Sequence, residues 1–94
     1  MAKTPSIDIR RPHSFDKATA REKAQGLAES MKEKMGIKWS WKGDTIEFSG
    51  KGAEGTVAVS DSDVHVQVYL DMLLKAMKGT LEGKINERLD KMLA

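Results

Sequence analysis

The stretch Asp63-Val64-His65-Val66-Gln67-Val68-Tyr69-Leu70 decides the fold of this 94-residue chain. Its valines and Leu70 occupy every second position, and polar side chains fill the positions between them, apart from Tyr69. This alternation has the period of a β-strand with one buried face. These residues therefore predict a strand whose apolar side belongs to the protein core.

Three segments before this strand show the same alternation, at residues 37–42, 45–49 and 56–60. Turn-forming residues separate the four segments: Gly43-Asp44, a glycine-rich loop over residues 50–55, and Asp61-Ser62. Four consecutive strands joined by short connections predict an antiparallel meander.

The N-terminal third predicts a short strand and then a helix. Residues 6–10 alternate, and we expect Arg11-Pro12-His13 to end this strand because proline lacks the N–H that a ladder needs. Ser14 is a suitable N-cap, and Gly36 a suitable stop. Between them one apolar face recurs at helical spacing: Ala20, Ala24, Leu27, Met31 and Met35.

The C-terminal quarter has a helical period again. Its apolar stripe consists of Leu73, Ala76, Met77, Leu81, Ile85, Leu89 and Met92. Gly79 and Gly83 weaken the stripe. We expect a short helix, a kink at Lys78-Gly79, and a long terminal helix with Thr80 as its cap.

These elements give the order β-α-β-β-β-β-α. The fold class is α+β, with two layers: an antiparallel sheet of about five strands and two helices that cover its apolar face. We expect a single domain over residues 1–94, with a loose N-terminal tail at residues 1–5. The pattern leaves the strand order open.

Composition restricts the function. The net charge is +2 and there is no cysteine, which excludes a disulfide framework, a thiol nucleophile and a cysteine-ligated zinc site. No run approaches the roughly 18–20 apolar residues of a membrane span, and no secretion or lipidation signal is recognised. We therefore expect a cytoplasmic protein.

The motifs with catalytic or binding associations have ordinary structural explanations. The glycines at 50, 52 and 55 match a dinucleotide fingerprint, but a strand follows them where that site needs a helix. His13 and His65 are too few for a metal site, and Trp39 and Trp41 share the buried phase. We therefore predict no enzyme activity, no catalytic residue, no metal and no cofactor.

Two groups of residues are candidates for contact with a partner or an anion. Arg10, Arg11 and His13 precede a helix N-terminus, where a phosphate or carboxylate is favoured. Met72, Met77 and Leu81 lie in the C-terminal helical region, and methionine adapts well to apolar surfaces.

The sequence also resembles the polyhydroxyalkanoic acid system family. The residues that carry the resemblance are Ile9-Arg10-Arg11-Pro12-His13-Ser14, Trp41-Lys42-Gly43-Asp44 with Ile46 and Phe48, Gly55-Thr56-Val57, Val64 to Leu70, and Lys78-Gly79 with the terminal amphipathic helix. The resemblance covers residues 7–93 and implies a small bacterial protein linked to polyester storage. It implies no catalytic residues.

We therefore expect a non-enzymatic accessory protein of polyhydroxyalkanoate storage, acting on the granule surface or on a granule protein. A hydrophobic-ligand binder of helix-grip type is the first alternative, by fold analogy. Nucleic-acid binding is the second and is disfavoured, because Lys and Arg are not gathered in one stripe. A homodimer through a sheet edge or the terminal helix stays open.

Overall fold

The computed structural model describes residues 4–93. Its elements, in chain order, are β1 (Ile7–Pro12), α1 (Lys17–Met35), β2 (Lys38–Lys42), β3 (Thr45–Gly50), β4 (Ala53–Val59), β5 (Asp63–Leu70), α2 (Met72–Lys75) and α3 (Lys78–Met92). The strand and helix order agrees with the prediction. Of the predicted loose tail, residues 1–3 lie outside the described residues.

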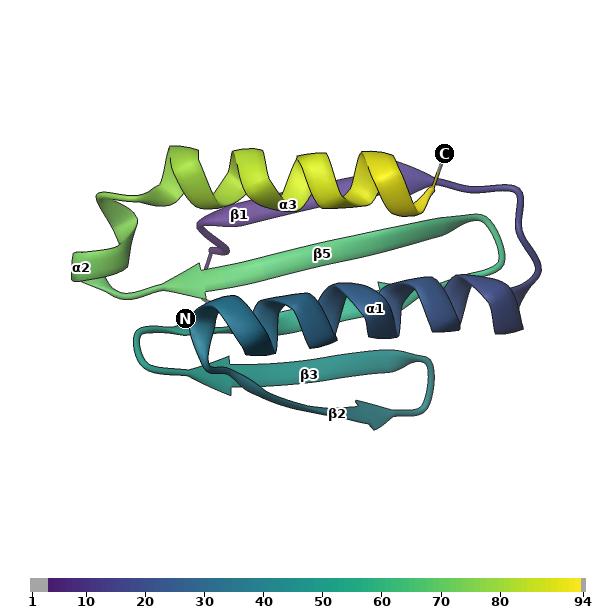
Figure 1. Ribbon diagram of the computed structural model, residues 1–94, viewed down its shortest axis with the longest axis horizontal. Coiled ribbons are helices and arrows are strands. Elements are labelled where there is room, and N and C mark those ends of the chain that lie inside the picture. Colours follow the sequence, from purple (N-terminus) through teal and green to yellow (C-terminus); the bar gives the residue numbers. More distant parts are fainter. Residues whose placement is uncertain (1–3, 94) are drawn as a thin grey trace.

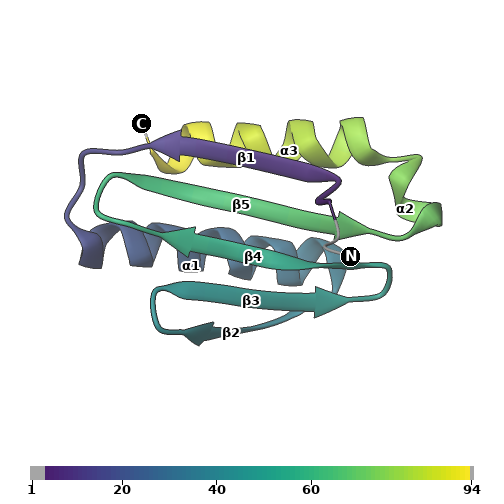
Figure 2. The same ribbon diagram turned by 180° about the vertical axis from the view of Figure 1, so that it is seen from behind.

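The five strands form one antiparallel sheet in the order β1-β5-β4-β3-β2 (Figure 2). β2 to β5 are the predicted meander. β1 adds to the free edge of β5, with Ile7 opposite Val68 and Arg10 opposite His65. The chain then crosses the sheet through α1 to start β2 at the other edge.

α1 and α3 cover the same face of the sheet and run in opposite directions (Figure 1). α1 contacts β2, β3 and β4, whereas α3 contacts β1 and α1. The core between the layers contains the buried hydrophobic residues Ile7, Ile9, Ala20, Ala24, Leu27, Ala28, Met31, Ile37, Ile46, Phe48, Ala53, Val57, Val59, Val64, Val66, Val68, Leu70, Ile85 and Leu89. Within residues 4–93 no helix lies over the other face of the sheet, so the predicted two-layer α+β class is confirmed.

Two boundaries near the N-terminus differ from the prediction. β1 continues through Pro12, which pairs with Asp63, because an edge strand tolerates a missing N–H on its outer side. The cap of α1 is Asp16, not Ser14: the Asp16 side chain accepts a hydrogen bond from the Thr19 amide at 2.9 Å. The end of α1 agrees with the prediction, since Gly36 adopts a left-handed conformation with φ 68°.

The predicted glycine-rich loop over residues 50–55 is instead a tight hairpin. Only Lys51 and Gly52 form the turn, and Gly52 has φ 80°. Gly55 lies within β4, where an added Cβ would stand 2.0 Å from the Gln67 carbonyl oxygen and 2.8 Å from the Phe48 ring. Glycine is therefore needed for close packing there, and this explains its presence in a strand.

The C-terminal region has the predicted short helix and long helix, but the break falls at Ala76 and Met77, before Lys78-Gly79. Thr80 lies inside α3 and does not cap it; Met77 occupies the cap position without a side-chain hydrogen bond. The apolar stripe is partly buried at Leu81 and Met92 and buried at Ile85 and Leu89. Leu73, Ala76 and Met77 are exposed because α2 and the first turn of α3 extend past the sheet.

Candidate functional site

Three large apolar side chains are exposed at the α2 end of the helical layer. Met72 is 88% exposed, Leu73 83% and Met77 50%, and we call these three residues the α2 patch. Asp71 explains their orientation, because its side chain caps α2 by accepting from the Leu74 amide at 3.0 Å. Leu74 then packs against the core, whereas Met72 and Leu73 face solvent.

The backbone also fixes this end of the molecule. The Asp71 amide donates to the Gly52 carbonyl at 2.8 Å, which joins the start of α2 to the β3–β4 turn. The Met77 amide donates to the Leu74 carbonyl at 2.9 Å. The α2 patch is therefore held on a hydrogen-bonded turn of helix and not on an irregular loop.

Beside the patch, a groove of about 460 Å³ lies between α1 and α3. We call it the interhelical groove. Its apolar lining combines buried and part-exposed side chains: Leu27, Met31, Met35, Ile37, Ala53, Leu74, Met77, Leu81 and Ile85. Met77 belongs to both features, so the groove opens next to the α2 patch.

The rim of the groove is basic. Lys34, Lys51, Lys84 and Arg88 line it, and none of these four is in an ion pair within residues 4–93. The one carboxylate in the lining, Glu87, pairs with Lys91 at 3.6 Å. The groove therefore combines an apolar interior with unneutralised positive charge at its edge.

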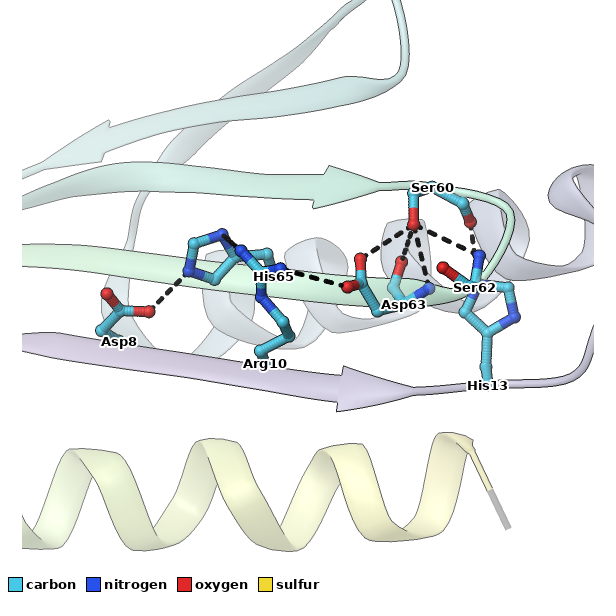
Figure 3. Close-up of polar contacts among 7 residues, drawn as sticks. All are labelled: Asp8, Arg10, His13, Ser60, Ser62, Asp63 and His65. Atoms are coloured by element: carbon cyan, nitrogen blue, oxygen red, sulfur yellow. Dashed lines mark hydrogen bonds and ion pairs between the residues drawn. The ribbon is translucent and has the colours of Figure 1, made fainter.

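A polar network lies on the uncovered sheet face, between β1 and β5 (Figure 3). His65 Nε2 is 2.5 Å from Asp8 Oδ1, and Arg10 lies 3.4 Å from His65 Nδ1 and 3.5 Å from Asp63 Oδ2. The hydrogen bond from His65 holds the pKa of Asp8 below its ordinary value. These side chains form polar contacts with one another across β1 and β5, and such cross-strand pairs stabilise the attachment of β1 to the sheet.

The structure does not bring the predicted basic cluster to one place. Arg10 lies on the uncovered face, whereas Arg11 lies on the opposite face and donates to Asn86 at 2.8 Å and to Asp90. His13 Nε2 is 2.9 Å from the Ser60 carbonyl (Figure 3). The Phe15 amide donates to His13 Nδ1 at 3.2 Å. Each of the three side chains has its own partners.

The predicted apolar contacts lie closer together. Met72 and Met77 belong to the α2 patch, and Leu81 lines the groove beside Met77. Sequence reasoning placed Leu73 in the apolar stripe of the C-terminal helices but did not name it among the contact residues. It also missed the four rim cations, which come from α1, the β3–β4 turn and α3 and meet only in the folded chain.

The remaining sequence candidates have packing roles. Trp39 and Trp41 are half-buried against the core; Trp41 donates to Gln25 at 3.1 Å and lies 4.3 Å from the Arg21 guanidinium carbon. Within residues 4–93 no three acidic, histidine or cysteine side chains are placed to hold a metal ion. In that same part of the chain, no helix combines the length and apolarity required to cross a bilayer.

One comparison with known proteins identifies a matching protein family. Residues 7–93 match the model of a family described as polyhydroxyalkanoic acid system protein. No curated protein and no solved structure matches the chain.

Proposed function

The chain belongs to the polyhydroxyalkanoic acid system family, and from this premise we propose that it is a non-enzymatic accessory protein of polyhydroxyalkanoate storage. It acts in the cytoplasm on the granule surface or on a protein bound there. The observation that carries the proposal is the α2 patch, which exposes three large apolar side chains within residues 72–77.

The patch has the properties of a contact surface. Large apolar side chains gathered on one part of a small protein are characteristic of interaction sites, whereas isolated ones are common everywhere. Methionine and leucine adapt to an irregular apolar surface such as a polyester. Burial of one such side chain contributes roughly 1.5–3 kcal/mol to adsorption.

The surrounding charges support the same use. Lys75 and Lys78 are exposed next to the patch. They are suited to a surface that carries negative charge, and they keep the patch soluble before it binds. The histidines support a non-enzymatic role, because His13 and His65 are both engaged in contacts that fasten strands and turns.

Co-sedimentation with isolated granules tests the proposal. The purified protein is mixed with protein-coated granules and with stripped granules, at low and high salt. The test variant carries Met72→Ser and Leu73→Ser, and the control is Ala18→Ser, an exposed position on α1. Melting temperatures are compared first, and both variants should match the parent protein because these side chains are exposed.

We expect the parent and the control to sediment with stripped granules at both salt concentrations, since apolar adsorption is not screened by salt. The double variant should lose about tenfold or more in affinity. Binding to coated granules alone would assign the patch to a protein partner. Equal sedimentation of parent and double variant, or no sedimentation with either granule preparation, would contradict the proposal.

A further inference from the structure

We propose that the interhelical groove is a binding site for a single acyl chain with a carboxylate head group. The apolar lining takes the chain, and the rim cations take the head. This inference goes beyond the granule role and does not depend on it.

The apolar interior has the form that a hydrocarbon chain needs. Leu27, Met31, Ile37 and Ile85 are almost fully buried by the protein and still border the groove, so they form its floor. Leu74, Met77 and Leu81 form the end nearest α2. A volume of about 460 Å³ lies within the range of small-molecule sites, which is roughly 300–1,000 Å³.

The helices leave this space because of their side chains and because of the path of α3. Ser30, a small residue, occupies the α1 wall. On the other side α3 begins past the sheet, and its residues 78–80 are exposed. The groove therefore runs along α3 from Leu81 past Ile85 to Lys91.

The rim selects the charge of the ligand. Lys34, Lys51, Lys84 and Arg88 come from α1, the β3–β4 turn and α3 and line the same groove. Among the residues that the structure describes, none of the four has a carboxylate partner. Four like charges at one site repel one another, and an anion relieves that repulsion. Arginine adds two parallel donors that match a carboxylate. A neutral or cationic amphiphile neither relieves the repulsion among the rim cations nor accepts the paired hydrogen bonds of arginine as a carboxylate does.

The same charges disfavour a second copy of this chain as the occupant. The apolar surface that a second copy would offer is the α2 patch, which is flanked by Lys75 and Lys78. Insertion of that patch would add positive charge to a positive rim. A free carboxylate with an alkyl chain complements both the floor and the rim.

Calorimetric titration with decanoate tests the inference, and decylammonium is the probe of opposite charge on the same chain. Binding is also followed by amide chemical shifts, which should change along the groove-facing sides of α1 and α3. We expect decanoate to bind, butanoate to bind at least about tenfold more weakly, and added salt to weaken binding. Decylammonium should bind at least about tenfold more weakly than decanoate.

Two variants localise the site. Ser30→Trp fills the groove from its α1 wall, where Ser30 is part-buried, and should abolish decanoate binding. Lys84→Gln with Arg88→Gln should raise the Kd about threefold to tenfold, because each exposed charge contributes a modest amount. The matched control is Lys32→Gln with Lys38→Gln, two exposed lysines outside the groove that also remove two charges. If Ser30→Trp fails to fold, the two charge variants decide.

The inference is overturned if decylammonium binds as well as decanoate, if decanoate does not bind, or if the control pair weakens binding as much as the rim pair. The granule proposal and the decanoate proposal can be contradicted independently of each other. Met72→Ser with Leu73→Ser removes side chains that do not line the groove, so decanoate binding should survive in that variant.

Discussion

The two halves of α3 differ in how they are attached to the rest of the protein (Figure 1). In the C-terminal half Ile85 and Leu89 are buried, and Arg11 reaches from β1 to Asn86 and Asp90. The N-terminal half starts without a side-chain cap, carries Gly79 and Gly83, and continues the exposed surface of α2. The comparison teaches that the C-terminal half stabilises the fold, whereas the N-terminal half joins α3 to the α2 patch, whose apolar side chains are available for binding.

The largest contrast should come from two leucines. Leu89 is completely buried, so Leu89→Ala should lower the free energy of unfolding by about 2–5 kcal/mol. Leu73 is 83% exposed, so Leu73→Ala should change it by no more than about 0.5 kcal/mol. Urea denaturation of both variants measures the difference. Similar losses for the two would break the comparison, since α2 would then be part of the core.

Arg11 should be the next largest effect. Its side chain is 30% exposed and holds α3 against β1, so Arg11→Ala should cost about 1–2 kcal/mol and speed amide exchange in residues 85–92. Arg10→Ala is the matched control, because the Arg10 side chain is 64% exposed and lies on the other face. If Arg10→Ala destabilises α3 as much, the link between Arg11 and the C-terminal half is wrong.

Gly83→Ala should strengthen the loosely attached half. A Cβ at this position meets nothing within 4 Å, and alanine favours a helix over glycine by about 1 kcal/mol. We expect a gain of about 0.5–1 kcal/mol in unfolding experiments, with granule binding unchanged. Destabilisation would show that Gly83 is needed for a close contact. Gly55→Ala, where the Cβ would clash, should instead cost about 2–3 kcal/mol.

The smallest effect should be a pH dependence of the ion pair between the start of α1 and the β2–β3 turn. Asp44 lies 2.5 Å from the Lys17 ammonium, which lowers the pKa of this carboxyl below 3.8. A carboxyl whose pKa is lower in the folded than in the unfolded state stabilises the fold at pH values above its unfolded pKa. This stabilisation is lost as the pH falls through the folded pKa. Asp44→Asn should therefore lower the melting temperature slightly at pH 6 but not at about pH 2. A constant difference at both pH values would contradict this role.

The sequence predicts most of the sheet because alternation is a local property. Residues 63–70 form β5 with the predicted bounds, and Gly43 and Gly36 are turn and stop as expected. Pro12 was misjudged because edge position, which depends on strand order, decides whether a proline is tolerated. The prediction of a loop over residues 50–55 was wrong at Gly55. This glycine lies in β4 and is required by its contacts with Phe48 on β3 and Gln67 on β5, which the local sequence does not show.

The candidate site was less predictable for a similar reason. Methionines and a stripe at helical spacing indicated a contact surface in the C-terminal region, and Met72 and Met77 are indeed exposed there. Helical spacing alone does not show where the sheet beneath the helix ends, so Leu73 was listed in the apolar stripe and was not singled out as a contact residue. The rim of the groove joins Lys34, Lys51 and Lys84 from segments that meet only through the tertiary fold.

Amide hydrogen exchange of the protein with and without stripped granules tests the central claim most directly. In free protein we predict slow exchange in β5 and in residues 85–89, and faster exchange in residues 72–80. On granules, new protection should appear in residues 72–80 and leave the uncovered sheet face unchanged. Protection confined to that sheet face, or slow exchange of residues 72–80 already in the free protein, would contradict the division between the α2 patch, which binds, and the C-terminal half of α3, which stabilises the fold.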